Sequence, residues 1–179
     1  MSDRAGDVLV IGYGNPGRLD DGLGPAVAER LRQFAIPGVD VEADYQLTVE
    51  DAAAVAEHDV VIFADAAQAG PEPMFFRAVE PKGELGFSSH GCEPPAVMAL
   101  ARDLFDAKTA GYVLGIRGYE FDRFGEGLSE AARANLDAAM EFLVEVLRSR
   151  KFDEAARRQF GAAPASPTGR NGLCKTKST

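Results

Sequence analysis

Short apolar runs alternate with longer amphipathic segments through the first 150 residues of the chain. Runs of four to eight residues rich in β-branched side chains are typical of strands that are buried on both faces, whereas apolar positions three and four apart indicate helices. The segments predicted to be strands are residues 8–11, 39–44, 59–64, 74–79 and 112–116. Those predicted to be helices are residues 23–34, an alanine-rich stretch that Thr48 can cap, and residues 94–105 and 129–148. This alternation predicts an α/β three-layer sandwich, a mostly parallel twisted sheet of about five strands with helices on both faces.

The pattern predicts one domain over residues 1–152 and a tail over residues 153–179. The tail is rich in Ala, Pro, Ser, Thr and Gly and ends in CKTKST. Such a composition buries too little apolar surface to offset the entropy lost on ordering, so we expect the tail to be disordered or loosely docked.

Charge and composition narrow the possible partners. The net charge is −9, and residues 151–179 carry six basic and two acidic residues, a net +4 that leaves −13 for residues 1–150. A body this acidic repels phosphate backbones, which disfavours nucleic-acid binding. No apolar run approaches the ~20 residues of a membrane helix, so no membrane association is expected. The absence of a signal-peptide pattern and a count of only two cysteines, Cys92 and Cys174, predict a cytoplasmic location.

Acidic and imidazole side chains follow several of the predicted strands. Asp20 and Asp21 come after the first strand, Asp44 ends the second, Asp65 ends the third, and His90 lies between the fourth strand and the next helix. Ligands of an open parallel sheet bind outside the carboxyl ends of its strands, so these residues are expected to share one edge.

Two carboxylates and an imidazole suit a divalent cation of intermediate softness. Three protein ligands leave positions open for water or substrate, as catalytic sites require. The cation would also relieve the repulsion between the carboxylates. We select Asp21, Asp65 and His90 as the catalytic and metal-binding trio, with Asp20 or Asp44 in support.

Each of these residues also has a purely structural interpretation. Asp20 and Asp21 precede a helix, where aspartate is favoured as a cap, Asp65 can be a turn residue, and His90 can be a satisfied loop histidine. Cys92, at a predicted helix N-terminus that would lower its pKa, can be a nucleophile beside His90 or a small apolar filler.

A glycine pattern after the first strand, GYGNPG at residues 12–17, matches the spacing of a dinucleotide-binding fingerprint. Pro16 and the two aspartates that follow weaken that match, because pyrophosphate requires amides there. The alternative is that the glycines allow a tight turn with positive φ. No nucleotide cofactor is therefore predicted.

The same N-terminal segment, VIGYGNPGRLDDGLG at residues 10–24, resembles the signature of hydrogenase maturation proteases. The resemblance continues in register between residues 8 and 148. The further matching motifs are DYQLT (44–48), FADA (63–66), SHG (89–91), GIRG (115–118) and GLS (127–129). The chain departs from the family at Asp21, where glutamate is common, and at Pro16 and Gly17, where an apolar pair is more usual.

The resemblance implies an endopeptidase that removes the C-terminal extension of a NiFe hydrogenase large-subunit precursor. In that family the positions equivalent to Asp21, Asp65 and His90 bind a metal. It implies that the metal is nickel supplied by the substrate, so that cleavage waits for nickel insertion. The metal could polarise the scissile carbonyl or activate water, with Asp20 or Asp44 transferring protons.

Three other functions remain open on the sequence. Peptidyl-tRNA hydrolases share the Gly-x-Gly-Asn-Pro-Gly motif, but their next segment holds a catalytic histidine where this chain has RLDDG. A non-enzymatic metal-binding maturation chaperone could use the same site, and a dehydrogenase could use the glycine pattern.

Overall fold

The computed structural model describes residues 7–82 and 92–158. Five strands form one sheet in the order β2-β1-β3-β5-β4. The strands are β1 (Val8–Tyr13), β2 (Val39–Asp44), β3 (Val60–Ala67), β4 (Met74–Val79) and β5 (Ala110–Arg117). The first three and β5 run parallel, whereas β4 is antiparallel to β5 and forms one edge. The mostly parallel sheet that the sequence predicted is confirmed.

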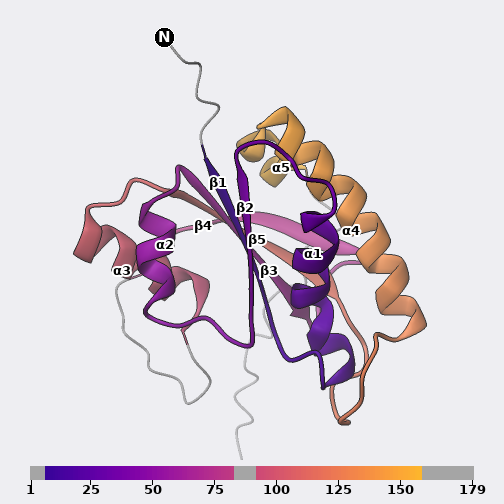
Figure 1. Ribbon diagram of the computed structural model, residues 1–179. Coiled ribbons are helices and arrows are strands. Elements are labelled where there is room, and N and C mark those ends of the chain that lie inside the picture. The colour runs from indigo at the N-terminus through magenta and orange to yellow at the C-terminus, as the bar shows by residue number, and fades with distance from the viewer. Residues whose placement is uncertain (1–6, 83–91, 159–179) are drawn as a thin grey trace, which may run out of the picture.

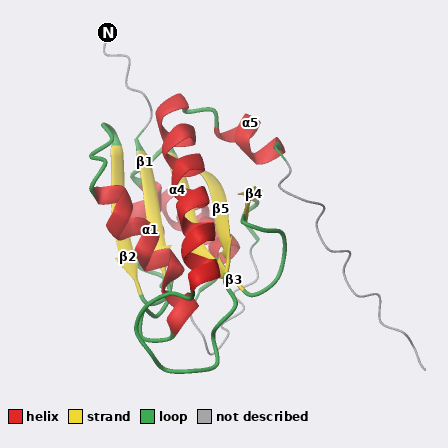
Figure 2. Cartoon of the chain, turned by 90° about the vertical axis from the view of Figure 1, so that its right-hand side faces the viewer, coloured by secondary structure: helices red, strands yellow, loops and turns green. Residues whose placement is uncertain are grey.

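Helices cover both faces of this sheet, as Figures 1 and 2 show. The helices are the 3-10 turn η1 (Leu19–Gly22), α1 (Leu23–Arg32), α2 (Asp51–Ala56), α3 (Pro94–Phe105), α4 (Glu130–Ser149) and α5 (Phe152–Arg157). Side chains of α1, α4 and α5 pack with one set of strand residues, and side chains of α2 and α3 pack with the alternate set. The strands alternate their side chains between the two faces, so β1, β3, β4 and β5 contribute to both cores, whereas β2 contributes Val39 and Val41 to the first core. The three-layer architecture is confirmed.

None of the helices within residues 7–82 and 92–158 combines the length and the apolar character needed to cross a bilayer.

Helix boundaries follow the predicted pattern closely, with one error at α2. Ser129 caps α4 by accepting a hydrogen bond from the backbone N–H of Ala132. Thr48 does not cap α2; instead, the carboxylate of Asp51 accepts hydrogen bonds from the backbone and hydroxyl of Thr48.

The chain remains ordered past the predicted domain boundary at residue 152. Phe152 and Ala155 of α5 are buried and belong to the same core cluster as α4. Tyr112 of β5 fixes this helix as well, because its hydroxyl donates a hydrogen bond of 2.7 Å to Asp153. The domain therefore reaches at least Arg157, and the predicted tail from residue 159 onward lies outside the described residues.

Candidate active site at the carboxyl ends of the strands

Three of the predicted site residues lie at the edge where the parallel strands end. Asp21 is in η1, the next element after β1, Asp65 is in the last part of β3, and Asp44 is the last residue of β2. His90 lies outside the described residues. The structure thus brings Asp21 and Asp65 to one edge, but leaves the predicted trio untested as a set.

Asp65 lies within β3 and does not end it, contrary to the sequence prediction. It pairs with Gly115 in the β3–β5 register, and the pairing continues to Ala67 and Arg117. The strand continues because β5 supplies hydrogen-bonding partners for two more residues beyond Asp65. Its side chain is consequently held by the sheet and not by a turn.

The environment of Asp65 favours a protonated carboxyl. Burial, together with the negative charge of Asp21, raises its pKa to about 6. Hydrogen bonds from the backbone N–H of Ala66, at 2.7 Å, and from Tyr13 act in the opposite direction and limit the rise. Asp21 therefore lies close enough to Asp65 for the two carboxylates to repel each other.

Tyr13 is a site residue that the sequence prediction missed. Burial raises the pKa of its hydroxyl, and the charge of Asp65 adds to the effect. Tyr13 follows Leu9 and Ile11 on one face of β1, so the two-residue period of the strand was a signal for its position. The tyrosine is a neutral donor to Asp65 at neutral pH.

Asp21 is positioned by the backbone of the loop that precedes it. Its carboxylate accepts a hydrogen bond of 2.9 Å from the backbone N–H of Asn15. The start of α1 lies directly against the strands, because a Cβ on Gly24 would stand 2.1 Å from the carbonyl oxygen of Tyr13 and 2.6 Å from that of Ala64. Glycine at this position lets η1 approach β1 and β3, which carry Tyr13 and Asp65.

Asp20 is fully buried and acts as an anchor for a distant loop. Its two carboxylate oxygens accept hydrogen bonds from the backbone N–H groups of Tyr119, Glu120 and Ser129, and from the Ser129 hydroxyl. Burial alone would raise its pKa, but these hydrogen bonds outweigh burial and hold the pKa below its usual value. Both oxygens are engaged, so Asp20 is a positioning residue and a poor carrier of protons.

Asp44 is exposed and lies opposite Tyr13 in the β1–β2 register. Its carboxylate accepts a hydrogen bond of 2.8 Å from the backbone N–H of Tyr45. Of the two supporting carboxylates predicted from sequence, Asp44 is thus the one that solvent can reach.

A metal centre is not complete among the described residues. Within residues 7–82 and 92–158, no group of three or more His, Cys, Asp or Glu side chains is arranged to hold a metal ion. Asp21 and Asp65 supply two carboxylates whose repulsion a cation would relieve, which is a donor set that fits a divalent metal.

Cys92 and Glu93 follow His90 in the chain and lie near the same edge. The backbone N–H of Cys92 donates to the carbonyl of Leu47 at 3.0 Å, and the charge of Glu93 raises the pKa of Tyr13. The expected lowering of the Cys92 pKa is wrong. Burial raises the pKa of this thiol, and the charges of Asp51 and Glu50 raise it further. Cys92 therefore lacks the activated thiolate of a nucleophile.

The glycines after β1 serve close packing and a tight turn. Gly14 has φ of +138°, a conformation that glycine adopts readily. A Cβ on Gly12 would stand 2.1 Å from the carbonyl oxygen of Gly24. These observations support the structural interpretation of the pattern.

A cleft of about 480 Å³ opens beside Asp65, over β4 and β5 and next to the start of α3. The residues that line it are Tyr13, Asp65, Ala66, Ala67, Phe75, Arg77, Ala78, Val79, Glu80, Lys82, Glu93, Pro94, Pro95, Val113 and Gly115. Asp65 and Tyr13 are thereby accessible to a molecule that enters the cleft.

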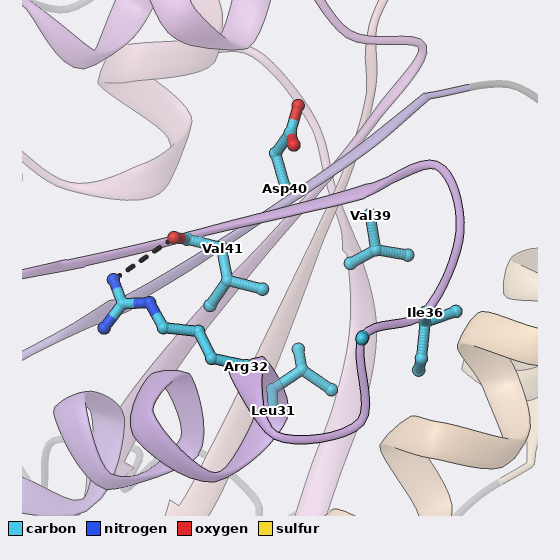
Figure 3. A pocket seen from close by; sticks show the side chains of 7 residues that line it. Leu31, Arg32, Ile36, Val39, Asp40 and Val41 are labelled. Atoms are coloured by element: carbon cyan, nitrogen blue, oxygen red, sulfur yellow. Dashed lines mark hydrogen bonds between the residues drawn. The ribbon is translucent and has the colours of Figure 1, made fainter.

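A smaller groove of about 170 Å³ lies at the opposite edge of the sheet, between α1 and β2 (Figure 3). Arg32 spans it and donates a hydrogen bond of 3.2 Å to the carbonyl of Val41. None of the predicted site residues lines this groove, so a substitution there can serve as a control for substitutions of Asp21 and Asp65.

No protein-family model and no curated protein sequence matches the chain. Solved structures do match it. The maturation protease HycI of NiFe hydrogenase from Thermococcus kodakarensis KOD1 is 25% identical with a TM-score of 0.63, over 81% of this chain and 95% of that one. The hydrogenase maturating endopeptidase HybD from E. coli is 22% identical with a TM-score of 0.64, over 81% and 94%.

A hydrogenase 2 maturation peptidase from a Thaumarchaeota archaeon is 21% identical with a TM-score of 0.58, over 79% and 97% of the two chains. The resemblance to hydrogenase maturation proteases that the sequence motifs predicted is therefore confirmed. The prediction of a peptidase agrees with the name of the Thermococcus kodakarensis protein, a maturation protease.

Proposed function

We propose that this protein, which resembles hydrogenase maturation proteases, is an endopeptidase that removes the C-terminal extension of a NiFe hydrogenase large-subunit precursor. The observation that carries the proposal is the pair of carboxylates, Asp21 and Asp65, at the strand ends of a chain that shares its fold with maturation proteases. Asp65 also lines the 480 Å³ cleft, which gives a polypeptide access to this carboxylate.

Nickel bound in the precursor is recognised by Asp21, Asp65 and His90, so the metal arrives with the substrate. The repulsion between the two carboxylates supports this assignment, because a cation relieves it. His90 is included because the SHG motif at residues 89–91 resembles the family's histidine motif. A divalent ion of this kind supplies a Lewis acid for the scissile carbonyl or for a water molecule.

The protein's own residues hold the substrate and the reacting groups in place. Tyr13 donates to Asp65 and fixes the orientation of its carboxylate. Asp20 holds residues 119–129 against η1 and thereby keeps Asp21 in position. Asp44, exposed at the end of β2, is the carboxylate available to transfer a proton.

The decisive experiment incubates the purified protein with nickel-loaded and nickel-free precursor and measures the mass of the precursor. We expect a loss of mass only in the nickel-loaded sample. Binding of the precursor without any loss of mass would instead identify a non-enzymatic maturation chaperone.

Variants assign the residues within the same assay. We expect Asp21→Asn, Asp65→Asn and His90→Gln each to lower processing at least ~100-fold, the usual scale for loss of a group acting in the reaction. The matched control is Arg32→Ala, in the groove between α1 and β2, which should process at the normal rate. Full processing by the Asp21 and His90 variants would contradict the assigned trio.

A further inference from the structure

Asp65, Gly115 and Phe75 form one row across three neighbouring strands. Asp65 pairs with Gly115 between β3 and β5, and Gly115 pairs with Phe75 between β5 and β4. Adjacent strands lie about 4.8 Å apart, and paired residues point to the same face of a sheet. The Phe75 position is therefore about 10 Å from the Asp65 position on the face that carries the cleft.

The ring of Phe75 lies over the bare backbone of Gly115. A Cβ on Gly115 would stand 2.2 Å from Cζ of this ring, so only glycine leaves room for it. The guanidinium of Arg77 stacks on the same ring, 4.9 Å from its centroid. Gly115 and Arg77 together hold the ring as a floor beside Asp65.

The cleft above this floor runs along β4 and β5. It extends from the row of Phe75 to Val79, four residues further along the strand. At about 3.3 Å per residue this is about 13 Å, the span of about four residues of extended peptide. The dimensions match a polypeptide segment.

Apolar groups form the interior of the cleft, and charged groups of both signs form its rim. Val113, Pro94 and Pro95 complete the apolar surface around the ring of Phe75. The exposed rim carries Arg77 and Lys82 together with Glu80 and Glu93. Balanced charges favour no single sign of ligand, so selection depends on the apolar interior.

We propose that this cleft is the specificity subsite of the protease, and that it binds an apolar side chain of the precursor within three residues of the scissile bond. The inference rests on the proposed function, because cleavage at Asp65 requires the adjoining peptide to enter the cleft that Asp65 lines. Phe75 and Gly115 determine the size of the side chain that is accepted.

The test compares wild-type protein with Phe75→Ala and Gly115→Ala on nickel-loaded precursors. Each precursor carries Ala, Leu or Phe at one of the three positions on either side of the scissile bond. Phe75→Ala enlarges the subsite and should raise the kcat/KM ratio of the Phe to the Ala precursor about tenfold at one position. Gly115→Ala pushes the ring into the cleft and should lower the same ratio about tenfold.

Controls separate this effect from general damage. Tyr45→Ala alters an aromatic residue that is 68% exposed and lies outside the cleft, so its ratios should equal those of wild type. Melting temperatures report whether the variants fold, and Phe75→Leu replaces Phe75→Ala if the latter does not. Ratios that agree within about twofold in every protein at all six positions would overturn the subsite. Failure of the wild type to cleave any precursor would instead overturn the proposed function.

Discussion

The carboxylate of Asp20 accepts hydrogen bonds from both the backbone N–H and the hydroxyl of Ser129, at 2.7 and 2.8 Å. These two residues are 109 positions apart in the chain. The contact joins the turn that carries Asp21 to the start of α4. In addition, the backbone N–H of Leu19 donates to the carbonyl of Gly125 at 3.0 Å, and the N–H of Gly125 donates to the carbonyl of Gly17 at 2.9 Å. These bonds fasten the loop between β5 and α4 to the start of η1.

Replacement of Asp20 should destabilise the fold. Asp20→Ala leaves the N–H groups of Tyr119, Glu120 and Ser129 without their acceptor, and each such loss costs about 1–3 kcal/mol. We expect the free energy of unfolding, measured with urea, to fall by about 3 kcal/mol or more. Asp44→Asn, at an exposed carboxylate, is the matched control and should change it by less than about 0.5 kcal/mol.

The stabilisation by Asp20 should depend on pH. Its pKa in the folded protein lies below the unfolded value of about 4, so the folded state binds fewer protons. The contribution is present above about pH 4 and is lost as the pH falls through the folded pKa. The difference in unfolding free energy between wild type and Asp20→Asn should therefore shrink below pH 4. A difference that stays constant from pH 7 to pH 2 would contradict the ionised anchor.

Asp65→Asn should raise stability while it abolishes processing. The pKa of Asp65 is raised to about 6 in the folded protein, so the folded state binds the extra proton and wild-type stability falls as the pH rises from about 4 to about 6. At pH 7 in a chelating buffer, the variant should be more stable by about 3 kcal/mol, since the pKa rises by about two units and each unit corresponds to about 1.4 kcal/mol. At pH 3.5 the two proteins should unfold alike.

Gly24→Ala should disturb both the fold and the site. The added methyl group would meet the carbonyl oxygens of Tyr13 and Ala64, which are backbone atoms and cannot turn away. We expect a loss of about 3 kcal/mol in unfolding free energy and slower precursor cleavage, because α1 must shift together with Asp21. Gly17→Ala is the control, since its methyl group would meet only the side chain of Asn15, at 3.2 Å.

Cys92 should react slowly with alkylating agents. Burial and the nearby charges of Asp51 and Glu50 raise the pKa of its thiol, so little thiolate is present at pH 8. In a Cys174→Ser background, we expect the rate with iodoacetamide at pH 8 to be below that of free cysteine and to rise with pH. An alkylation rate at pH 7 above that of free cysteine would contradict this prediction and support Cys92 as a nucleophile.

Much of the fold followed from the sequence because its signals are local. The apolar runs and helical spacing located every strand and α1, α3 and α4, and the proline pair at residues 94–95 marked the start of α3 correctly. Asp65 was misplaced because nothing in its neighbours reveals that β5 continues beside it to Arg117. The short helix α5 was missed because its burial depends on a contact with β5 rather than on its own composition.

Only part of the site was predicted, because some of its contacts join residues that are far apart in the sequence. The sequence placed Asp21 after the first strand and Asp65 at the end of the third, so topology alone was expected to bring them to one edge. The role of Asp20 depends on partners about 100 residues away. Asp20 and Asp21 are neighbours in the sequence, and nothing local indicates which of the two side chains is buried. Phe75 and Gly115 form a row only through the placement of β4 beside β5, an antiparallel pairing that periodicity does not encode.

The strand order also governs how the protein is assembled during synthesis. Among the strands of the described residues, β4 pairs with β5 alone, although β5 is translated about 30 residues later. Until β5 emerges from the ribosome and inserts between β3 and β4, both of those strands have an unpaired edge exposed to other chains. A chaperone that shields nascent polypeptides would thus have its greatest effect on the yield of this protein before residue 117 has been translated.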